Sequence, residues 1–280
     1  MKTPIGYYGG KQNLVKEILP LLPIHKQYVE PFFGGGAVYF AKPKSENECI
    51  NDLNFWAITF YKCVKLRFEE LQAKIHSSLH SEAQHNAAAL ILKATVPPPL
   101  PEFNMLTGDE EIEVAWAFWV RCNMSFGHVL FGGFAFSNNG QALGTANKRR
   151  SFTADYEKRL ENTEIFCRDA IDLIKLKDGE DTLFYVDPPY VSSDCGHYKG
   201  YTKEQFQELL EVLSTIKGKF LMSSYLEDNL VVAIEKYGWN IKKIEQVLQV
   251  TGKRETNKMK VECLTYNYQD SQLNLFNQNN

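Results

Sequence analysis

Short apolar runs alternate with amphipathic stretches along most of the chain, and this alternation predicts the order of strands and helices. The expected strands cover residues 28–30, 49–52, 165–169, 183–186, 220–224, 241–250 and 261–268. The expected helices cover residues 14–22, 55–71, 170–176, 202–217 and 227–237. Strands that alternate with helices in this way predict an α/β fold with a mostly parallel sheet.

The pattern changes in the middle of the chain, which predicts a lobe inserted into the α/β domain. Residues 72–95 are polar and rich in alanine, residues 97–101 form a proline-rich surface connector, and residues 112–126 return to a packed pattern. We therefore expect a catalytic domain of residues 1–60 and 160–268, a mainly helical lobe of residues 61–159, and a flexible tail of residues 269–280.

The strongest candidate for a functional site is Asp187-Pro188-Pro189-Tyr190, which follows the apolar run of residues 183–186. Neither proline has an N–H to donate, so the strand ends there and the turn is stiff. Asp187 and Tyr190 are therefore expected at the carboxyl end of a strand, where open α/β sheets bind their ligands. Asp187 and the Pro188 carbonyl can accept hydrogen bonds from an exocyclic amino group, and Tyr190 can stack on its ring. The alternative is a strand-ending turn with an incidental aspartate.

Two further motifs predict a nucleoside pocket beside this site. Gly34–Gly36 stand between an expected strand and an apolar run, and they allow the backbone to approach a ligand closely. Their spacing is neither that of the dinucleotide fingerprint nor that of a P-loop. Asp52 ends the next strand about 20 residues beyond the glycines, where a carboxylate can bind ribose hydroxyls. Asp169 ends a third strand in the same way.

Composition narrows the class of protein. The 280 residues are 44% hydrophobic, enough for a large core, and the net charge of −3 gives no global basic field for nucleic acid. The six cysteines lack the spacing of a metal knuckle or a redox pair, and no apolar run is long enough to span a bilayer. Because no signal peptide is recognisable, we expect a cytoplasmic protein with reduced thiols and no bound metal.

Three features of the expected lobe are candidates for chemistry. Asn139-Gly140 is a hairpin turn signal between aromatic flanks, so a β-hairpin is expected there. The triplet Lys148-Arg149-Arg150 follows, and it is either a solvated loop or a phosphate contact. His76 and His80 are one helical turn apart, as two metal ligands would be, but a solvated helix face explains them better.

Taken together, the motifs resemble the Dam-like, D12 class family of adenine-N6 DNA methyltransferases. The resemblance rests on residues 7–11 (Tyr-Tyr-Gly-Gly-Lys), residues 30–38 (Glu-Pro-Phe-Phe-Gly-Gly-Gly-Ala-Val), Asn51-Asp52 and residues 185–190 (Tyr-Val-Asp-Pro-Pro-Tyr). It covers the chain as far as Tyr268. It implies a Rossmann-like, S-adenosylmethionine-dependent enzyme that flips an adenine out of duplex DNA and methylates its N6. It also associates the chain with restriction–modification.

The resemblance implies roles for individual residues. Those that would hold S-adenosylmethionine are Tyr7, Lys11, Phe33, Gly34, Gly36, Asp52 (ribose), Asp169 (adenine amino group) and Asp187. Those that would serve the flipped target adenine are Asp187, Pro188 and Tyr190. Those that would contact DNA are Arg121, Asn123, Lys148, Arg149 and Arg150. Arg121-Cys122-Asn123 departs from the usual Asn-Arg arrangement of the family, so no recognised DNA sequence is transferred.

Two other functions are alternatives. A methyltransferase acting on adenine in RNA, or on another planar amide or amine, would use similar motifs, although the expected hairpin and basic triplet favour duplex DNA. A DNA-binding protein without catalysis would have no reason to keep Asp187. For the DNA adenine-N6 methyltransferase itself we expect a monomer or a weak dimer.

The tail contains an isolated apolar group within a polar, uncharged segment that is expected to be disordered. Residues 272–276 (Gln-Leu-Asn-Leu-Phe) resemble the peptide with which bacterial proteins dock on the DNA-polymerase sliding clamp. The residues that would make this contact are Gln272, Leu273, Leu275 and Phe276. The alternative is that the apolar side chains fold back onto the sheet.

Overall fold

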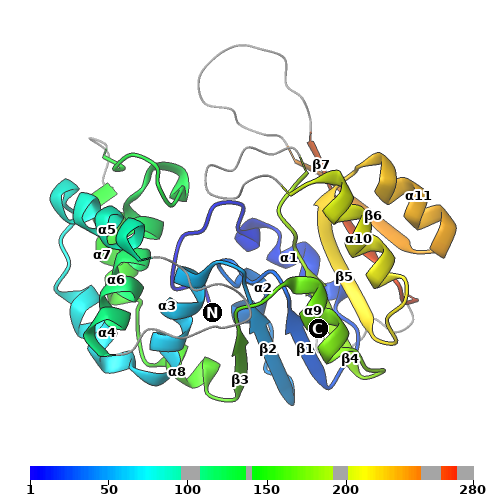
Figure 1. Ribbon diagram of the computed structural model, residues 1–280, viewed down its shortest axis with the longest axis horizontal. Coiled ribbons are helices and arrows are strands. Elements are labelled where there is room, and N and C mark those ends of the chain that lie inside the picture. The colour runs from blue at the N-terminus through cyan, green and yellow to red at the C-terminus, as the bar shows by residue number, and fades with distance from the viewer. Residues whose placement is uncertain (96–107, 137–140, 192–200, 247–259, 270–280) are drawn as a thin grey trace, which may run out of the picture.

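A seven-stranded sheet forms the centre of the computed structural model, which describes residues 1–95, 108–136, 141–191, 201–246 and 260–269 (Figure 1). The strands are β1 (Gln27–Glu30), β2 (Asn47–Asn51), β3 (Thr163–Phe166), β4 (Thr182–Val186), β5 (Lys219–Tyr225), β6 (Asn240–Gln246) and β7 (Lys260–Tyr266). They are ordered β3-β2-β1-β4-β5-β7-β6. Strands β1 to β5 pair in parallel, and β7 runs antiparallel to β5 and β6. The mostly parallel α/β sheet and its closing strand pair are thus confirmed.

Helices cover both faces of the sheet, and the alternation of side chains along β4 shows why. Phe184 and Val186 belong to an apolar cluster with the helices α9 to α11, whereas Leu183 and Tyr185 belong to a second cluster on the opposite face. The helices are α1 (Val15–Ile18), α2 (Ala37–Ala41), α3 (Phe55–Leu66), α4 (Phe68–His76), α5 (Glu82–Ala94), α6 (Gly108–Met124), α7 (Gln141–Arg150), α8 (Asp155–Leu160), α9 (Ala170–Lys177), α10 (Lys203–Leu213) and α11 (Asp228–Tyr237). Short 3-10 turns lie at Lys11–Asn13, Leu19–Leu21 and Phe126–His128.

The direction of winding reverses between β1 and β4. From β1 the chain proceeds outward through β2 to β3, then returns to β4 and proceeds the other way to β5. In an open α/β sheet such a reversal leaves a crevice at the carboxyl ends of the two central strands. Glu30 ends β1 and Asp187 follows β4, so both motifs singled out in the sequence lie at this crevice.

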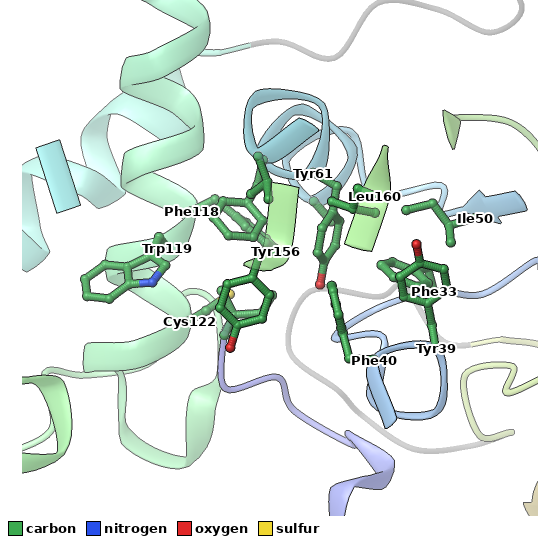
Figure 2. Packing of buried hydrophobic residues seen from close by; sticks show 14 of the residues in the cluster. Phe33, Tyr39, Phe40, Ile50, Tyr61, Phe118, Trp119, Cys122, Tyr156 and Leu160 are labelled. Atoms are coloured by element: carbon green, nitrogen blue, oxygen red, sulfur yellow. The ribbon is translucent and has the colours of Figure 1, made fainter. Parts of the chain in front are cut away.

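Helices α3 to α8 occupy the connection between β2 and β3, and α4 to α7 lie beyond the β3 edge of the sheet (Figure 1). One continuous apolar cluster joins them to the sheet. Figure 2 shows Phe118 and Trp119 of α6 on one side, Phe33 and Phe40 on the other, and Tyr61 of α3 between them. The ring of Tyr61 packs edge-on against Phe33, with centroids 4.7 Å apart. The boundary expected at residue 61 falls inside α3, and these helices share the core of the sheet.

The structure corrects several expected elements. The helix expected over residues 55–71 breaks at Arg67, whose backbone (φ −139°, ψ 40°) is not helical, and continues as α4. The helix begun by the Thr202 capping box ends at Leu213, before Gly218. Gly218 instead allows two chain segments to approach, because a Cβ there would lie 2.9 Å from the carbonyl oxygens of Gly179 and Thr182.

The β-hairpin expected around Asn139-Gly140 is wrong, because the segment that follows the turn is a helix and not a strand. The turn itself, Asn139-Gly140, lies outside the described residues, as does the proline-rich connector at 97–101. Helix α7 begins directly after Gly140, because residues 141–150 consist mainly of good helix formers such as Ala, Leu, Gln, Lys and Arg. The pairing described in this region is a single antiparallel bridge between Ser125 and Phe134.

The histidines of the lobe also differ from expectation. Helix α4 ends at His76, so His76 and His80 do not share a helix face. His80 contacts the Ala135 carbonyl oxygen at 3.0 Å and Thr145 Oγ1 at 2.9 Å. The described residues contain no group of three side chains placed to bind a metal. None of the described helices is both long and apolar enough to cross a membrane.

Candidate active site

A cavity of about 520 Å³ lies at the crevice between β1 and β4, a size typical of small-molecule pockets. It is formed by the N-terminal segment around Tyr7 and by the loops that follow β1, β2, β3 and β4. All the residues that the sequence predicted for the cofactor and the target base line it: Tyr7, Lys11, Phe33, Gly34, Gly36, Asp52, Asp169, Asp187, Pro188 and Tyr190.

The loop after β1 owes its shape to its glycines and to Asp52. Gly34 and Gly36 have positive φ angles of 49° and 66°, which side-chain-bearing residues rarely adopt. A Cβ at Gly34 would lie 2.9 Å from Cε1 of Tyr7, so the glycine also makes room for that ring. The Gly34 amide donates to Asp52 Oδ2 at 2.7 Å, and the Asn54 amide donates to Asp52 Oδ1 at 2.8 Å. Burial raises the pKa of Asp52 to about 6.

Asp169 is the exposed N-cap residue of α9. Its Oδ1 accepts hydrogen bonds from the amides of Ile171 (2.8 Å) and Asp172 (3.3 Å). These bonds fix the carboxylate at the end of β3 and satisfy two of the amides that a helix leaves open at its N-terminus. Asp169 lines the cavity from the segment that follows β3, whereas Tyr190 lines it from the segment that follows β4.

Lys11 contacts two residues of the Asp187-Pro188-Pro189-Tyr190 turn. Its Nζ is 2.7 Å from Asp187 Oδ1 and donates to the hydroxyl of Tyr190 at 2.5 Å. The Tyr190 hydroxyl in turn donates to the carboxylate of Glu262, at 2.8 Å and 3.0 Å to its two oxygens. On the Tyr190 ring, Tyr225 stacks with centroids 3.9 Å apart and an interplanar angle of 25°. The sequence predicted Lys11 as a cofactor ligand, whereas its closest contacts are with the residues predicted for the target base.

Burial shifts the pKa of several groups in this cluster. It raises the pKa of Asp187 to about 6, while the adjacent Lys11 ammonium lowers it. Burial, with the neighbouring charges of Asp187 and Glu262, raises the pKa of Tyr190, so its hydroxyl stays protonated at neutral pH. Deeper in the crevice, burial raises the pKa of Glu30 to about 8, and the Tyr28 hydroxyl donates to Glu30 Oε1 at 2.5 Å.

Sequence reasoning did not single out Glu262, Ser223 and Tyr225 as site residues, although they surround the Tyr190 hydroxyl and ring. Two of them come from β5 and one from β7, strands that carry no recognisable motif. One signal was present: Glu262 stands between the apolar residues Val261 and Cys263, and an acid in a buried strand usually has a partner.

The side chains of Arg121 and Asn123, both predicted to contact DNA, make hydrogen bonds within the protein. Arg121 is 3% exposed, and its guanidinium donates to the carbonyl oxygens of Leu130 (2.6 Å) and Gly132 (2.7 Å). It also contacts the ring of the buried His85. Asn123 Oδ1 accepts from the Gly6 amide at 3.0 Å and its Nδ2 donates to the Trp119 carbonyl at 2.9 Å. The assignment of Arg121 to DNA contact is therefore wrong, because its side chain holds the loop after α6.

The basic triplet forms the last residues of α7 and is not a loop. Lys148 Nζ donates to the Thr3 carbonyl at 3.1 Å, and Arg149 donates to the carbonyls of Ser78 and His76. These two side chains tie α7 to neighbouring segments. Arg150 is exposed, as are Phe126 (73%) and Phe136 (82%) on the loop that Arg121 holds.

The fold and the cavity define a Rossmann-like methyltransferase: a glycine loop follows the first strand, and an Asp-Pro-Pro-Tyr turn follows the strand across the switch point. A sequence model described as the D12 class N6 adenine-specific DNA methyltransferase matches residues 7–255. Because that match spans most of the 280 residues, the chain belongs to the D12 class N6 adenine-specific DNA methyltransferase family.

Individual relatives agree with this family. The chain is 25% identical over 290 residues to the type II methyltransferase M1.LlaDCHI of Lactococcus lactis subsp. cremoris, covering 93% of each chain. It is 26% identical over 313 residues to the type II methyltransferase M.MjaIII of Methanocaldococcus jannaschii, covering 96% of this chain and 99% of that one. A shorter match, 38% identical over 68 residues, is to the DNA N-6-adenine-methyltransferase of Escherichia phage P1; it covers 24% of this chain and 9% of the phage protein.

Proposed function

We propose that this protein transfers a methyl group from S-adenosylmethionine to the N6 amino group of an adenine flipped out of duplex DNA. The observation that carries the proposal is that Asp187 to Tyr190 share one cavity with the Gly34–Gly36 loop and Asp52. Membership of the adenine-specific DNA methyltransferase family supports adenine as the methylated base and DNA as the substrate. A DNA substrate also supports a cytoplasmic location.

The residues of the cavity fit S-adenosylmethionine. Asp52 lies where a carboxylate can bind ribose hydroxyls, and Asp169 can accept a hydrogen bond from the adenine amino group. Tyr7 offers an aromatic face next to the Gly34 backbone. When bound, the cofactor supplies an activated methyl group on a positively charged sulfur, and the acidic lining of the cavity suits that charge.

Asp187 and Pro188 would orient the nucleophile. The lone pair of an adenine N6 is delocalised into the ring, so the amino group is a poor nucleophile. Hydrogen bonds from N6 to the Asp187 carboxylate and the Pro188 carbonyl would favour a more tetrahedral nitrogen and direct its lone pair at the methyl group. The Asp187 carboxylate would also stabilise the positive charge that develops on N6 as its bond to the methyl carbon forms and the carbon–sulfur bond breaks. N6 would then release one proton to solvent, which gives the neutral methylated base. Catalysis would therefore rest on positioning and electrostatics without a covalent enzyme intermediate.

Base flipping would bring the target to this site, because a duplex hides the adenine N6. Tyr225 stacks on the Tyr190 ring, and Lys11 Nζ lies 4.7 Å from the centroid of that ring. In the complex the flipped adenine would stack on Tyr190. Flipping costs a few kcal/mol, which contacts elsewhere on the DNA must offset. The exposed Phe126 and Phe136 and the cation of Arg150 support such contacts by the lobe.

The direct test is methyl transfer by the purified protein. Duplex DNA of mixed sequence and, in a parallel reaction, RNA of mixed sequence are incubated with S-adenosylmethionine carrying a labelled methyl group, and the digested nucleosides are separated. We expect label in N6-methyl-2′-deoxyadenosine from DNA, and loss of transfer in Asp187→Ala. Label in RNA in place of DNA would favour the RNA alternative, and transfer that persists in Asp187→Ala would refute the assigned mechanism.

We further propose that the tail docks on a bacterial sliding clamp through residues 272–276. These residues lie outside the described part of the chain, and the support is their sequence pattern alone, with Gln272 for hydrogen bonding and Leu275-Phe276 for an apolar pocket. Tethering to the clamp would raise the effective concentration of the enzyme on newly replicated DNA.

A further inference from the structure

The carboxylate of Glu262 is buried within the active-site cluster although it comes from the antiparallel strand β7. Its side chain is 5% exposed. Besides the Tyr190 hydroxyl, Oε1 accepts a hydrogen bond from Ser223 Oγ at 2.6 Å, and it lies 3.7 Å from Lys11 Nζ. Glu262 pairs across the sheet with Tyr225, the residue that stacks on Tyr190. It also lies outside residues 7–255, where the family model matches.

We propose that Glu262 is a positioning residue for the methyl transfer: through the Tyr190 hydroxyl it fixes the ring on which the target adenine stacks. This inference rests on the proposed function. Tyr225 stacks on the face of the Tyr190 ring, and Glu262 accepts a hydrogen bond from its hydroxyl. Both contacts come from the paired strands β5 and β7, so the rigid sheet sets the plane of a ring that is itself carried by a loop.

The same carboxylate places the Lys11 ammonium. Lys11 Nζ lies between two acids, 2.7 Å from Asp187 and 3.7 Å from Glu262, and it also donates to the Tyr190 hydroxyl. The hydroxyl therefore accepts from Lys11 and donates to Glu262, which joins four side chains into one network. In such a network the loss of one member affects the others, and the coupling can be measured by double-mutant cycles.

A purely structural role does not account for this arrangement. Burying a carboxylate lowers the stability of the fold, and an apolar side chain of similar volume at this position of β7 would pack at least as well. The Tyr190 hydroxyl donates to Glu262 and so connects its carboxylate with the predicted catalytic motif. Ser223 donates a second hydrogen bond, which holds the carboxylate in place.

The test is a double-mutant cycle between Glu262→Gln and Tyr190→Phe, measured as single-turnover methyl transfer to duplex DNA. Glu262→Gln keeps an oxygen that can accept from the Tyr190 hydroxyl but removes its charge. The rate should therefore fall about 5- to 10-fold, the difference expected between a charged and a neutral hydrogen bond. In the Tyr190→Phe background the same change should lower it less than about threefold, because the hydroxyl through which Glu262 acts is gone. Binding of S-adenosylmethionine by calorimetry should stay within about twofold of the wild type. The matched control is Glu235→Gln, an exposed acid on α11.

The outcomes separate this inference from the proposed function. Equal fold-losses from Glu262→Gln in the two backgrounds would show that Glu262 does not act through Tyr190, and would overturn the inference alone. The same holds if all of the loss appears in cofactor binding, or if the unfolding temperature falls and the rate per folded molecule does not. An inactive wild-type protein would overturn the proposed function and the inference together.

Discussion

Replacing Lys11 with methionine should move the acid limb of the pH–activity profile to higher pH. Lys11 Nζ lies 2.7 Å from Asp187 Oδ1, and methionine keeps most of the side-chain volume but removes the charge. Burial raises the pKa of Asp187 to about 6 even with this ammonium beside it. An opposite charge at such a distance typically lowers a carboxyl pKa by about 1–3 units. Without Lys11, the pKa of Asp187 should therefore lie at roughly 7–9.

The size of the effect follows from the ionised fraction of Asp187. The carboxylate must be ionised to accept a hydrogen bond from N6 and to stabilise the positive charge that develops there. Activity should therefore rise as the pH rises through the pKa of Asp187. At pH 7 a pKa of about 6 leaves roughly nine-tenths of the molecules ionised, whereas a pKa of about 8 leaves roughly one-tenth. The other titratable groups that interact electrostatically with Asp187 include Glu262, Tyr190, Glu30 and Tyr185, and all of these remain in the variant.

The assay is kcat/KM for methyl transfer between pH 5.5 and 9.5, because this ratio reports the pKa values of the free enzyme. Lys16→Met, which alters an exposed lysine of α1, is the matched control and should keep the wild-type profile. Loss of Lys11 contacts with a ligand would lower the whole curve, but only a changed pKa moves its midpoint. An acid limb at the same pH in Lys11→Met and in the wild type would refute the assignment of that limb to Asp187 and the electrostatic role of Lys11.

Three further changes test other parts of the account. Glu30 retains its proton up to about pH 8 when folded but releases it near its usual pKa when unfolded, so the free energy of unfolding should fall by about 1.4 kcal/mol per pH unit between these values. Glu30→Gln should flatten that pH dependence in denaturant titrations. An unchanged slope would mean that Glu30 is already ionised in the folded protein. Arg150→Ala should weaken binding to all DNA sequences similarly and reduce the salt slope by about one, whereas an unchanged slope would mean that the end of α7 does not contact phosphate. Leu275→Ala/Phe276→Ala should abolish binding to the sliding clamp in a titration in which the intact protein binds, and equal binding by both would retire the clamp proposal.

The sheet and the cavity were largely predictable because their signals are local. A short apolar run that ends at Asp187-Pro188 indicates both a buried strand and its end, and the Thr202 capping box marks the start of α10. Glycines at positive φ likewise occur where the sequence placed a close backbone approach. Since the carboxyl ends of parallel strands meet at one edge, correct strands were sufficient to bring the motifs together.

The lobe was less predictable because its arrangement depends on contacts distant in sequence. Arg121 looks like a surface cation in the sequence, yet the carbonyls of Leu130 and Gly132 bind it in the interior. Lys148 is likewise engaged by Thr3, 145 residues away. Glu262 was not singled out for the same reason: only the pairing of β5 with β7 brings it to the Tyr190 hydroxyl.

The most direct test of the account is to sequence genomic DNA from cells that express the protein, with detection of modified bases at single-nucleotide resolution. The host should lack adenine methylation of its own, and cells expressing Asp187→Ala provide the control. The account predicts N6-methyladenine at one recurring sequence in cells with the wild-type protein and its absence in the control. Unmodified adenine throughout the genome of wild-type-expressing cells, or methylation of a base other than adenine, would contradict the account.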